Sequence, residues 1–439
     1  MAIATAHDIA DSVRERAIIV AVVRKGANPA TVSEHLDELE LLLDTAGADV
    51  ALRLYQERDR PNVALGIGTG KLDELKELVE SEQVQMVVFD DELTPVQVRN
   101  LEKELQVKVL DRTGVILDIF AAHAQSVESR TQVELAQLEY LMPRLTRMWT
   151  HLSKQFGGVG TKGPGETQIE TDRRMYRTRI QRLKEKLSHL QTQRSIQRKG
   201  RAGLPRFALV GYTNAGKSSL MQAITGATVH IEDRLFATLD STVRAFELPN
   251  GRKALLSDTV GFIRKLPTQL VASFQTTLAE TIEADVLLHV VDASNQFVRD
   301  HIAVVDATLE ELGANTIPTI VVFNKIDAVV DPYLVNDLLT AYPSSIAVSA
   351  LETTNIDELL QRMSVLFEAS SVTRRLVLPW TSNKEVSKIY DSTEVLSRED
   401  NENGVALLVK ITADKLQEFD QRYSAFLDVD TISQTQTIH

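Results

Sequence analysis

The sequence contains no cysteine, and it has no run of about twenty consecutive apolar residues. A chain without cysteine forms no disulfide bonds, and a chain without such an apolar run offers no segment that could cross a membrane as a helix. The N-terminus also lacks the pattern of a secretory signal peptide. We therefore predict a cytoplasmic protein without disulfides and without a membrane span.

Basic residues are fewer than acidic ones, with 48 Lys and Arg against 61 Asp and Glu, which gives a net charge of −13. Such an excess of negative charge argues against indiscriminate binding to nucleic acid. The length of 439 residues is too great for one ordinary core and suggests about three domains. Outside residues 206 to 370 there is no cysteine and no other obvious cluster of catalytic residues. This disfavours an RNA-modifying enzyme.

The first informative motif is a glycine-rich segment that follows a short apolar run. It reads Gly211, four further residues, Gly216, Lys217 and Ser218, which is the spacing of a phosphate-binding P-loop. The glycines let backbone N–H groups point at phosphate oxygens, Lys217 can reach the outer phosphates, and the Ser218 hydroxyl can ligate Mg²⁺. We predict that a nucleoside triphosphate contacts Gly211, Tyr212, Thr213, Asn214, Ala215, Gly216, Lys217, Ser218 and Ser219.

A second motif predicts which nucleotide binds. An apolar run of strand length ends in Asn324, Lys325, Ile326 and Asp327, and this resembles the guanine-specificity element of small GTPases. A carboxylate at Asp327 could accept from both N1–H and the N2 amino group of guanine, whereas adenine offers no such pair of donors. An unsatisfied buried polar group costs about 1 to 3 kcal/mol, so this discrimination is strong. Ser349 and Ala350, after a further apolar run, resemble the loop that backs the guanine ring.

Two further elements stand between these motifs. Asp258 follows an apolar run and lies three residues before Gly261, so that Asp258 would hold Mg²⁺ through water and the Gly261 N–H would touch the γ-phosphate. Each motif alone has a simpler interpretation as a surface turn or a polar loop, but their joint order after strand-like runs favours a GTPase. We assign Mg²⁺ to Ser218, Thr238 and Asp258, and catalysis to Lys217, Thr238 and Gly261.

The switch threonine is assigned to Thr238, in a segment that begins with Phe236, which we also place at the nucleotide. Thr228 and Thr242 are nearby alternatives, but Thr242 already enters the next strand. Phe262 stands where many GTPases carry the glutamine that orients the attacking water. Intrinsic hydrolysis should therefore be slow and open to stimulation by a partner. Asn214 either helps to bind K⁺ or only pins the turn.

Residues 16 to 125 predict a separate α/β unit. Strand-like runs at 17–23, 48–54, 86–89 and 107–110 alternate with helical patterns at 31–44, 71–82, 94–104 and 114–124, as in a small parallel sheet. A glycine-rich segment, 66–71, leads into a helix. It is either a plain turn or a second anion site, which could take the phosphate of a nucleotide such as ATP or of RNA.

Residues 130 to 205 predict two long helices that pair as an antiparallel hairpin. Leu138, Met142, Leu145, Trp149 and Leu152 recur at helical spacing, and a second series follows after a glycine-rich break at 157–165, which we interpret as a mobile tip. The second helix is basic, carrying Arg173, Arg174, Arg177, Arg179, Arg182, Lys184, Lys186, Arg194, Arg198, Lys199 and Arg201. In an acidic protein this helix is either a solvated face or, as we favour, an RNA contact.

Three longer motifs resemble the signatures of HflX GTPases, namely residues 111–120, 132–141 and 163–174. The resemblance implies an N-terminal α/β domain, a helical hairpin and a GTPase domain. It also implies binding to the large ribosomal subunit and its rRNA and a role in splitting or rescuing stalled ribosomes. Phe262 matches the hydrophobic substitution of that family. The sequence departs from the usual pattern at residues 128–131 and at Ser241.

The C-terminal part predicts a small α+β appendage, with strands at 375–380 and 405–411, helices at 385–390 and 414–419, and a turn at 397–404. We expect an α/β protein of four parts, residues 1–127, 128–205, 206–371 and 372–439. We expect it to act as a monomer that binds GTP and GDP and hydrolyses GTP with Mg²⁺, and to control ribosome binding by its nucleotide state. The alternative is a GTP-gated RNA-binding factor in ribosome biogenesis.

Overall fold

The structure is a computed structural model, in which the chain divides into two compact units. Unit 1 comprises Met1–Ser188, Glu232–Asp240 and Lys265–Gln275, and unit 2 comprises the remaining residues. The residues that the structure describes are 14–145, 164–199, 204–226, 235–236, 238–265, 280–369, 371–401 and 404–428.

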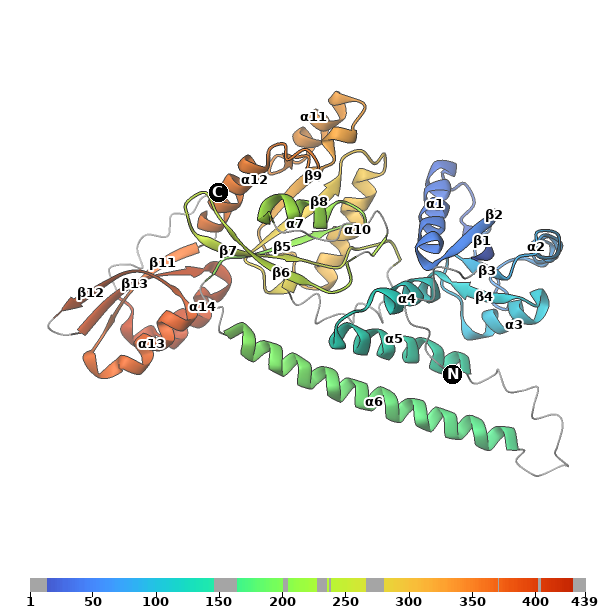
Figure 1. The fold of residues 1–439 in the computed structure, drawn as a ribbon, viewed down its shortest axis with the longest axis horizontal. Coiled ribbons are helices and arrows are strands. Elements are labelled where there is room, and N and C mark those ends of the chain that lie inside the picture. Colours follow the sequence, from blue (N-terminus) through green and yellow to red (C-terminus); the bar gives the residue numbers. More distant parts are fainter. Residues whose placement is uncertain are drawn as a thin grey trace. The chain divides into compact units, whose positions relative to one another are not determined.

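The first part of the chain alternates strands with helices and then continues into two long helices (Figure 1). Its elements are β1 (Glu15–Val23), α1 (Pro29–Ala46), β2 (Ala48–Glu57), α2 (Thr69–Ser81), β3 (Met86–Phe89), α3 (Pro95–Leu105), β4 (Lys108–Asp111), α4 (Arg112–His123), α5 (Val127–Leu145) and α6 (Pro164–Lys199).

The four strands form one parallel sheet in the order β2-β1-β3-β4, so the predicted parallel α/β unit is confirmed. Strand β3 is buried at every position because helices cover both faces of a parallel sheet. The helix boundaries follow local chemistry. Asn28 caps α1 by accepting from the Ala30 N–H, and Gly47 ends it in the left-handed conformation.

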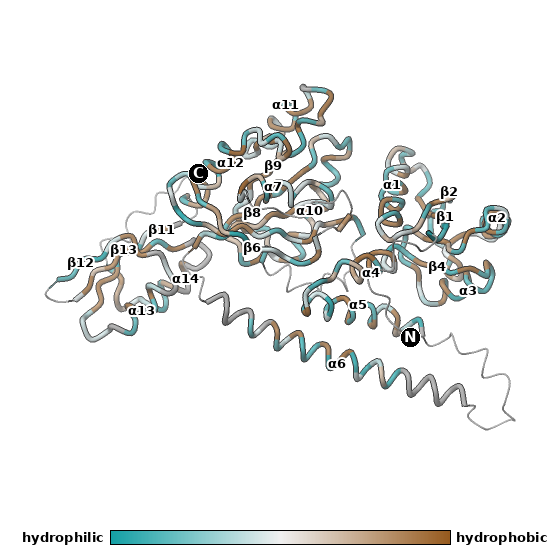
Figure 2. The backbone as a smooth tube through the Cα atoms, in the orientation of Figure 1, coloured by the Kyte–Doolittle hydropathy of each residue, from teal (hydrophilic) through white to brown (hydrophobic). Residues whose placement is uncertain are grey.

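Helices α5 and α6 pair as the predicted antiparallel hairpin. Leu135 packs against Leu183 and Leu187, and ion pairs join Glu134 to Arg179 and Lys184 to Glu139 at their sides. Hydrophilic and hydrophobic stretches alternate along α6 (Figure 2), as expected for a helix that buries one stripe.

The predicted C-terminal boundary of the hairpin tip is wrong. Residues 164 and 165, assigned to the glycine-rich tip, belong to α6, which begins at Pro164. Proline is tolerated in the first turn of a helix, where its missing N–H would have no partner within the helix in any case. The rest of the tip, together with Trp149 and Leu152, lies outside the described residues.

The nucleotide-site sheet of unit 2 has six strands in the order β10-β9-β8-β5-β7-β6, and only β6 runs antiparallel to its neighbour. Its elements are β5 (Arg206–Gly211), α7 (Lys217–Thr225), β6 (Thr242–Glu247), β7 (Lys253–Asp258), β8 (Val286–Asp292), α10 (Val298–Glu311), β9 (Thr319–Asn324), the 3-10 turn η2 (Ile326–Ala328), α11 (Pro332–Ala341), β10 (Ile346–Ala347) and α12 (Ile356–Ala369).

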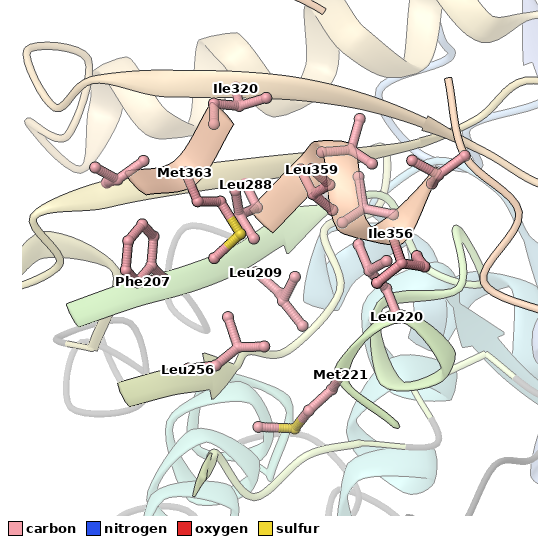
Figure 3. Close-up of a cluster of buried hydrophobic side chains, with 14 of the residues drawn as sticks. Phe207, Leu209, Leu220, Met221, Leu256, Leu288, Ile320, Ile356, Leu359 and Met363 are labelled. Carbon is pink, nitrogen blue, oxygen red and sulfur yellow. The ribbon is translucent and has the colours of Figure 1, made fainter. Parts of the chain in front are cut away.

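Apolar side chains on both faces of this sheet explain why the strands stay in place. On one face Leu209 and Leu288 pack with Leu220 of α7 and with Leu359 and Met363 of α12 (Figure 3). On the other face a second cluster joins the sheet to α10 and α11. With both faces covered, the carboxyl ends of the strands become the exposed edge where ligands bind in such folds.

The C-terminal part is a three-stranded antiparallel sheet in the order β11-β13-β12, packed against two helices. Its elements are β11 (Ser371–Leu378), η3 (Trp380–Ser382), α13 (Asn383–Ser392), β12 (Glu394–Asn401), β13 (Gly404–Thr412), α14 (Ala413–Arg422) and η4 (Ser424–Phe426). The α+β appendage is thus confirmed.

The predicted turn at 397–404 is wrong, because residues up to Asn401 form strand β12. The acidic and polar composition of this segment suggested a turn. An edge strand tolerates such residues, since only one of its sides pairs with the sheet.

None of the helices in the described parts of the chain is both long and apolar enough to cross a bilayer. The predicted domain boundaries and the monomeric state stay predictions.

A buried histidine in β8 makes unit 2 sensitive to acid. His289 is 1% exposed, and burial, with a smaller contribution from the charge of Lys217, lowers its pKa to about 4. Its Nδ1 lies 3.7 Å from Asp306 Oδ1, but a neutral imidazole makes no ion pair there at neutral pH. The unfolded chain binds a proton near pH 6.5, so the stabilisation is complete above pH 6.5 and is lost as the pH falls toward 4.

We expect wild-type protein to lose about 2 kcal/mol of stability between pH 7 and pH 5 through His289 alone. His289→Leu should lose correspondingly less, whereas His189→Leu, at an exposed position of α6, should behave like wild type. Amide hydrogen exchange of β8 peptides at the two pH values measures this difference. Equal acid sensitivity of wild type and His289→Leu would contradict the assignment.

Candidate nucleotide-binding site

The P-loop connects β5 to α7 at the carboxyl edge of the six-stranded sheet. Gly211 has φ +151, and a Cβ there would lie 2.2 Å from the Val290 carbonyl oxygen of the neighbouring strand. Gly216 has φ +88, and a Cβ there would lie 2.3 Å from Asn324 Nδ2. Both positions therefore require glycine, because the backbone must pass close to its neighbours.

The Lys217 ammonium group points back over this loop. Its Nζ donates to the carbonyl oxygens of Gly211 at 3.1 Å and Tyr212 at 2.9 Å. The residue is buried, and this burial lowers the pKa of Lys217 to about 8, although the charge of Asp258 acts in the opposite direction. A buried ammonium group that donates to carbonyl oxygens is well suited to exchange them for phosphate oxygens.

A hydroxyl and a carboxylate meet beside the start of α7. Ser218 Oγ donates to Asp258 Oδ2 at 2.7 Å, and Asp258 is fully buried at the end of β7. Hard oxygen donors of this kind suit Mg²⁺, which takes few protein ligands and keeps waters and phosphate oxygens as the others. Ser218 and Asp258 thus fit the predicted metal site.

The segment after Asp258 lies directly on the P-loop. The Phe262 N–H donates to the Gly211 oxygen at 3.0 Å, and the Thr213 N–H donates to the Phe262 oxygen at 2.8 Å. A Cβ at Gly261 would lie 2.8 Å from Thr213 Cα and 2.9 Å from Lys217 Nζ. Gly261 is therefore next to the lysine, and its predicted contact with the γ-phosphate stays a prediction. Phe262 is 1% exposed and cannot orient water.

The guanine-specificity segment joins the P-loop through Asn324. Asn324 Nδ2 donates to the Ala215 oxygen at 3.0 Å, and its Oδ1 accepts from the Ala350 N–H at 3.0 Å. One buried amide thus fixes three predicted segments with respect to one another. The Ser349 hydroxyl donates to Asp327 Oδ1, which holds that exposed carboxylate in a defined direction. Ser219, in the first turn of α7, is half-buried.

Two contacts of this site each involve a residue that the sequence did not indicate. Lys325 Nζ lies 2.8 Å from Asp292 Oδ2, at the end of β8. The Tyr212 ring stacks on His301 with centroids 3.9 Å apart. Asp292 stands at the end of an apolar run, and this position in the sequence could have indicated a site residue. The stacking of His301 depends on the packing of α10, and no feature of the sequence indicates it.

Asn214 is exposed and has φ +59, a conformation that asparagine adopts more readily than most residues. This conformation fits the tight turn of the P-loop, and the K⁺ alternative stays a prediction.

Phe236 and Thr238 group with unit 1 rather than with the P-loop, which belongs to unit 2. The roles of these two residues at the nucleotide stay predictions. In the glycine-rich segment at 66–71, Gly68 caps α2 and its N–H donates to Gln56 Oε1 at 2.8 Å. This hydrogen bond stabilises the turn that precedes α2. ATP binding at this segment stays a prediction.

Four family descriptions match successive parts of the chain. "GTP-binding GTPase N-terminal" matches residues 33–121, and "GTP-binding GTPase Middle Region" matches 123–201. "50S ribosome-binding GTPase" matches 206–325, which holds the P-loop, Asp258 and Gly261, and "HflX C-terminal domain" matches 338–430.

Several curated relatives are named GTPase HflX. The chain is 44% identical to that of Caldanaerobacter subterraneus subsp. tengcongensis over 91% of this chain and 92% of the relative. It is 54% identical to that of Flavobacterium psychrophilum over 72% of this chain and 76% of the relative. It is 42% identical to that of Escherichia coli over 86% and 90%.

Among solved structures, a complex of SsGBP with GDP is 28% identical and covers 81% of this chain and 99% of its own, with a TM-score of 0.45. A GTP-binding protein from Sulfolobus solfataricus in complex with GDP is 28% identical over 80% of this chain and 99% of its own, with a TM-score of 0.41.

Proposed function

Because this chain belongs to the HflX family of GTPases, we propose that it binds the large ribosomal subunit in its GTP state and splits or rescues stalled ribosomes. The observation that carries this proposal is that the part of the chain holding the nucleotide site matches a family described as "50S ribosome-binding GTPase". The chain binds GTP and hydrolyses it, and the proposal adds what the hydrolysis controls.

The residues of the site suggest how the triphosphate is held. Lys217 would exchange its two carbonyl partners for phosphate oxygens, and the Gly261 N–H would contact the γ-phosphate beside it. Asp327, directed by Ser349, would accept from the guanine edge. Ser218 and Asp258 would hold Mg²⁺, which would neutralise phosphate charge when bound.

The absence of a glutamine at position 262 suggests that GTP hydrolysis is regulated by a partner. Phe262 is buried against the P-loop and offers no polar side-chain atom, so that positioning of the attacking water must come from elsewhere. We therefore expect slow hydrolysis by the protein alone and faster hydrolysis when a partner completes the site.

Helix α6 supplies the charge that an RNA partner would need. Arg173, Arg177, Arg182 and Lys186 are exposed, whereas Arg179 and Lys184 pair with acidic residues of α5. Exposed basic residues along one helix can neutralise phosphates in an acidic protein. The side chains of the basic residues after position 193 lie outside the part of the chain that the structure describes.

Removing that charge should weaken ribosome binding in a salt-dependent way. In the triple variant Arg173→Ala, Arg177→Ala, Lys186→Ala, each lost phosphate contact should lower the salt slope of affinity by about one unit. Arg99→Ala with Lys103→Ala, at exposed positions of α3, is the matched control. Binding to large subunits across a salt series measures both, and an unchanged slope in the triple variant would remove α6 from the contact.

Sedimentation with separated ribosomal subunits tests the proposed function itself. In the presence of a non-hydrolysable GTP analogue we expect the protein to pellet with large subunits, and with GDP we expect it to stay in the supernatant. Preference for precursor particles over mature subunits would favour the biogenesis factor instead. Equal binding in both nucleotide states would contradict control by the nucleotide.

A further inference from the structure

The P-loop carries a buried hydroxyl whose role the site described above does not explain. Thr213 is 7% exposed, and its Oγ1 has no hydrogen-bond partner within the described part of the chain. A hydroxyl that leaves water and gains no partner costs stability, so such groups are rare in native proteins. An unpaired hydroxyl beside a ligand site therefore indicates that the bound ligand or its reaction supplies the partner.

Other hydroxyls around the site do have partners in the protein. Ser218 donates to the carboxylate at the end of β7 at 2.7 Å, and Ser257 and Thr259 donate to carbonyl oxygens of β5 at 3.1 Å and 2.6 Å. These bonds hold neighbouring strands and the start of α7 together. Thr213 forms no such bond to the residues that the structure describes, so support of the backbone does not account for its hydroxyl.

Thr213 lies beside the groups that we assign to the outer phosphates. A Cβ added at Gly261 would lie 2.8 Å from Thr213 Cα, 2.9 Å from Thr213 Cγ2 and 2.9 Å from Lys217 Nζ. The threonine side chain and the ammonium group therefore meet next to Gly261. A lysine at this place in a P-loop reaches the β- and γ-phosphates. Because Oγ1 and Cγ2 share one Cβ, rotation about a single bond brings the hydroxyl to the place expected for the γ-phosphate.

Thr213 is also bonded to the residue that stands in the glutamine position. Its N–H donates to the Phe262 oxygen at 2.8 Å, and the Phe262 N–H donates to the Gly211 oxygen at 3.0 Å. A third bond runs from the Arg264 N–H to the Tyr212 hydroxyl at 3.0 Å. The P-loop is thus held against this segment, and a polar group that is fixed in advance stabilises a transition state without reorganisation.

We propose that the Thr213 hydroxyl takes the place of the missing glutamine and positions the attacking water during GTP hydrolysis. In this step the water oxygen forms a bond to the γ-phosphorus, and the bond from that phosphorus to the oxygen shared with the β-phosphate breaks. GDP leaves with the shared oxygen, and the water proton goes to the released phosphate. The hydroxyl accepts a hydrogen bond from the water and donates one to a γ-phosphate oxygen, so it is unchanged at the end.

Thr213→Val removes the hydroxyl and keeps the shape of the side chain. We expect single-turnover hydrolysis of GTP by the full chain to slow at least about tenfold, because a contact made in the transition state is lost. The affinities for GDP and for a non-hydrolysable GTP analogue should change by less than about twofold. Thr213→Ser restores a hydroxyl and should keep most of the wild-type rate.

Thr281 offers a matched control in the same unit. Its Oγ1 is also buried and has no partner among the described residues. Thr281 precedes β8, whose amino end lies at the edge of the sheet opposite the P-loop. Thr281→Val should therefore leave hydrolysis unchanged. Neither valine substitution should lower the midpoint of thermal unfolding, since each removes a polar atom without a partner.

Several results would overturn the proposal. These are wild-type hydrolysis in Thr213→Val, an equal fall in Thr281→Val, Thr213→Ser as slow as Thr213→Val, and a lowered unfolding midpoint in Thr213→Val. A loss of analogue affinity at an unchanged rate would make the hydroxyl a ground-state contact and would also contradict it.

The inference rests on the proposed placement of the γ-phosphate beside Lys217, which Lys217→Ala tests separately. If Lys217→Ala keeps triphosphate binding, the placement itself is wrong. If Lys217→Ala loses triphosphate binding while Thr213→Val hydrolyses GTP at the wild-type rate, only the role of Thr213 is wrong.

Discussion

Replacement of Asp327 by asparagine is expected to lower the affinity for GTP about a hundredfold, because two hydrogen bonds from guanine to a charged acceptor are lost. The same change should improve binding of xanthosine triphosphate. Xanthine carries an oxygen where guanine carries its N2 amino group, and the new amide can donate to it. The Ser349 hydroxyl, which directs the Asp327 carboxylate, should direct the amide oxygen equally well.

The measurement is a competition between the two nucleotides for the same protein. Asp337→Asn, at an exposed position of α11, removes the same charge without touching the site and should keep the preference for GTP. Asp327→Asn protein that still binds GTP with wild-type affinity would mean that another group recognises the base.

Lys217→Ala is expected to have the larger effect on triphosphate binding. Truncation removes a buried charge from the phosphate site, and the loss of one partner of a buried ion pair costs about 3 to 5 kcal/mol, which is at least a hundredfold in affinity. Lys253→Ala, at the exposed start of β7, removes the same charge elsewhere in unit 2 and should leave the affinity unchanged.

The pKa of this lysine adds a second signature. With a pKa of about 8 in the absence of nucleotide, Lys217 is protonated below pH 8 and loses its charge above it. Bound phosphate favours the charged form, so GTP affinity should fall as the pH rises above 8. Lys217→Ala should lack this dependence. Triphosphate affinity at pH 7 and pH 9 decides the matter, and a wild-type affinity that is flat across this range would contradict the role of the lysine.

Much of the fold follows from local patterns. Apolar runs bounded by turn residues located the four strands of the N-terminal sheet, and β5, β7, β9 and β10 of the six-stranded sheet, because a strand buried on two faces must be apolar throughout. The two errors lie where that reasoning does not apply. Residues 397–401 form an edge strand despite their polar composition, and α6 begins at a proline that suggested a break.

The P-loop and the guanine-specificity segment could be located because their chemistry depends on residue types at short spacing. Contacts between distant segments could not. The packing of Phe236 on Phe120 and the hydrogen bonds of Asp240 to the start of α5 join residues more than a hundred positions apart. The sequence around Phe236 and Asp240 indicates a switch segment but not its partners. The contacts of this segment with α4 and α5 are seen only in the structure.

Steady-state GTP hydrolysis with purified ribosomal subunits tests most directly the claim that a partner completes this nucleotide site. The protein alone should turn over slowly, large subunits should accelerate hydrolysis strongly, and small subunits should not. Lys217→Ala should show no hydrolysis in any of the three mixtures. If the protein hydrolyses GTP equally fast with and without large subunits, its GTPase cycle is not controlled by the ribosome and the account is wrong.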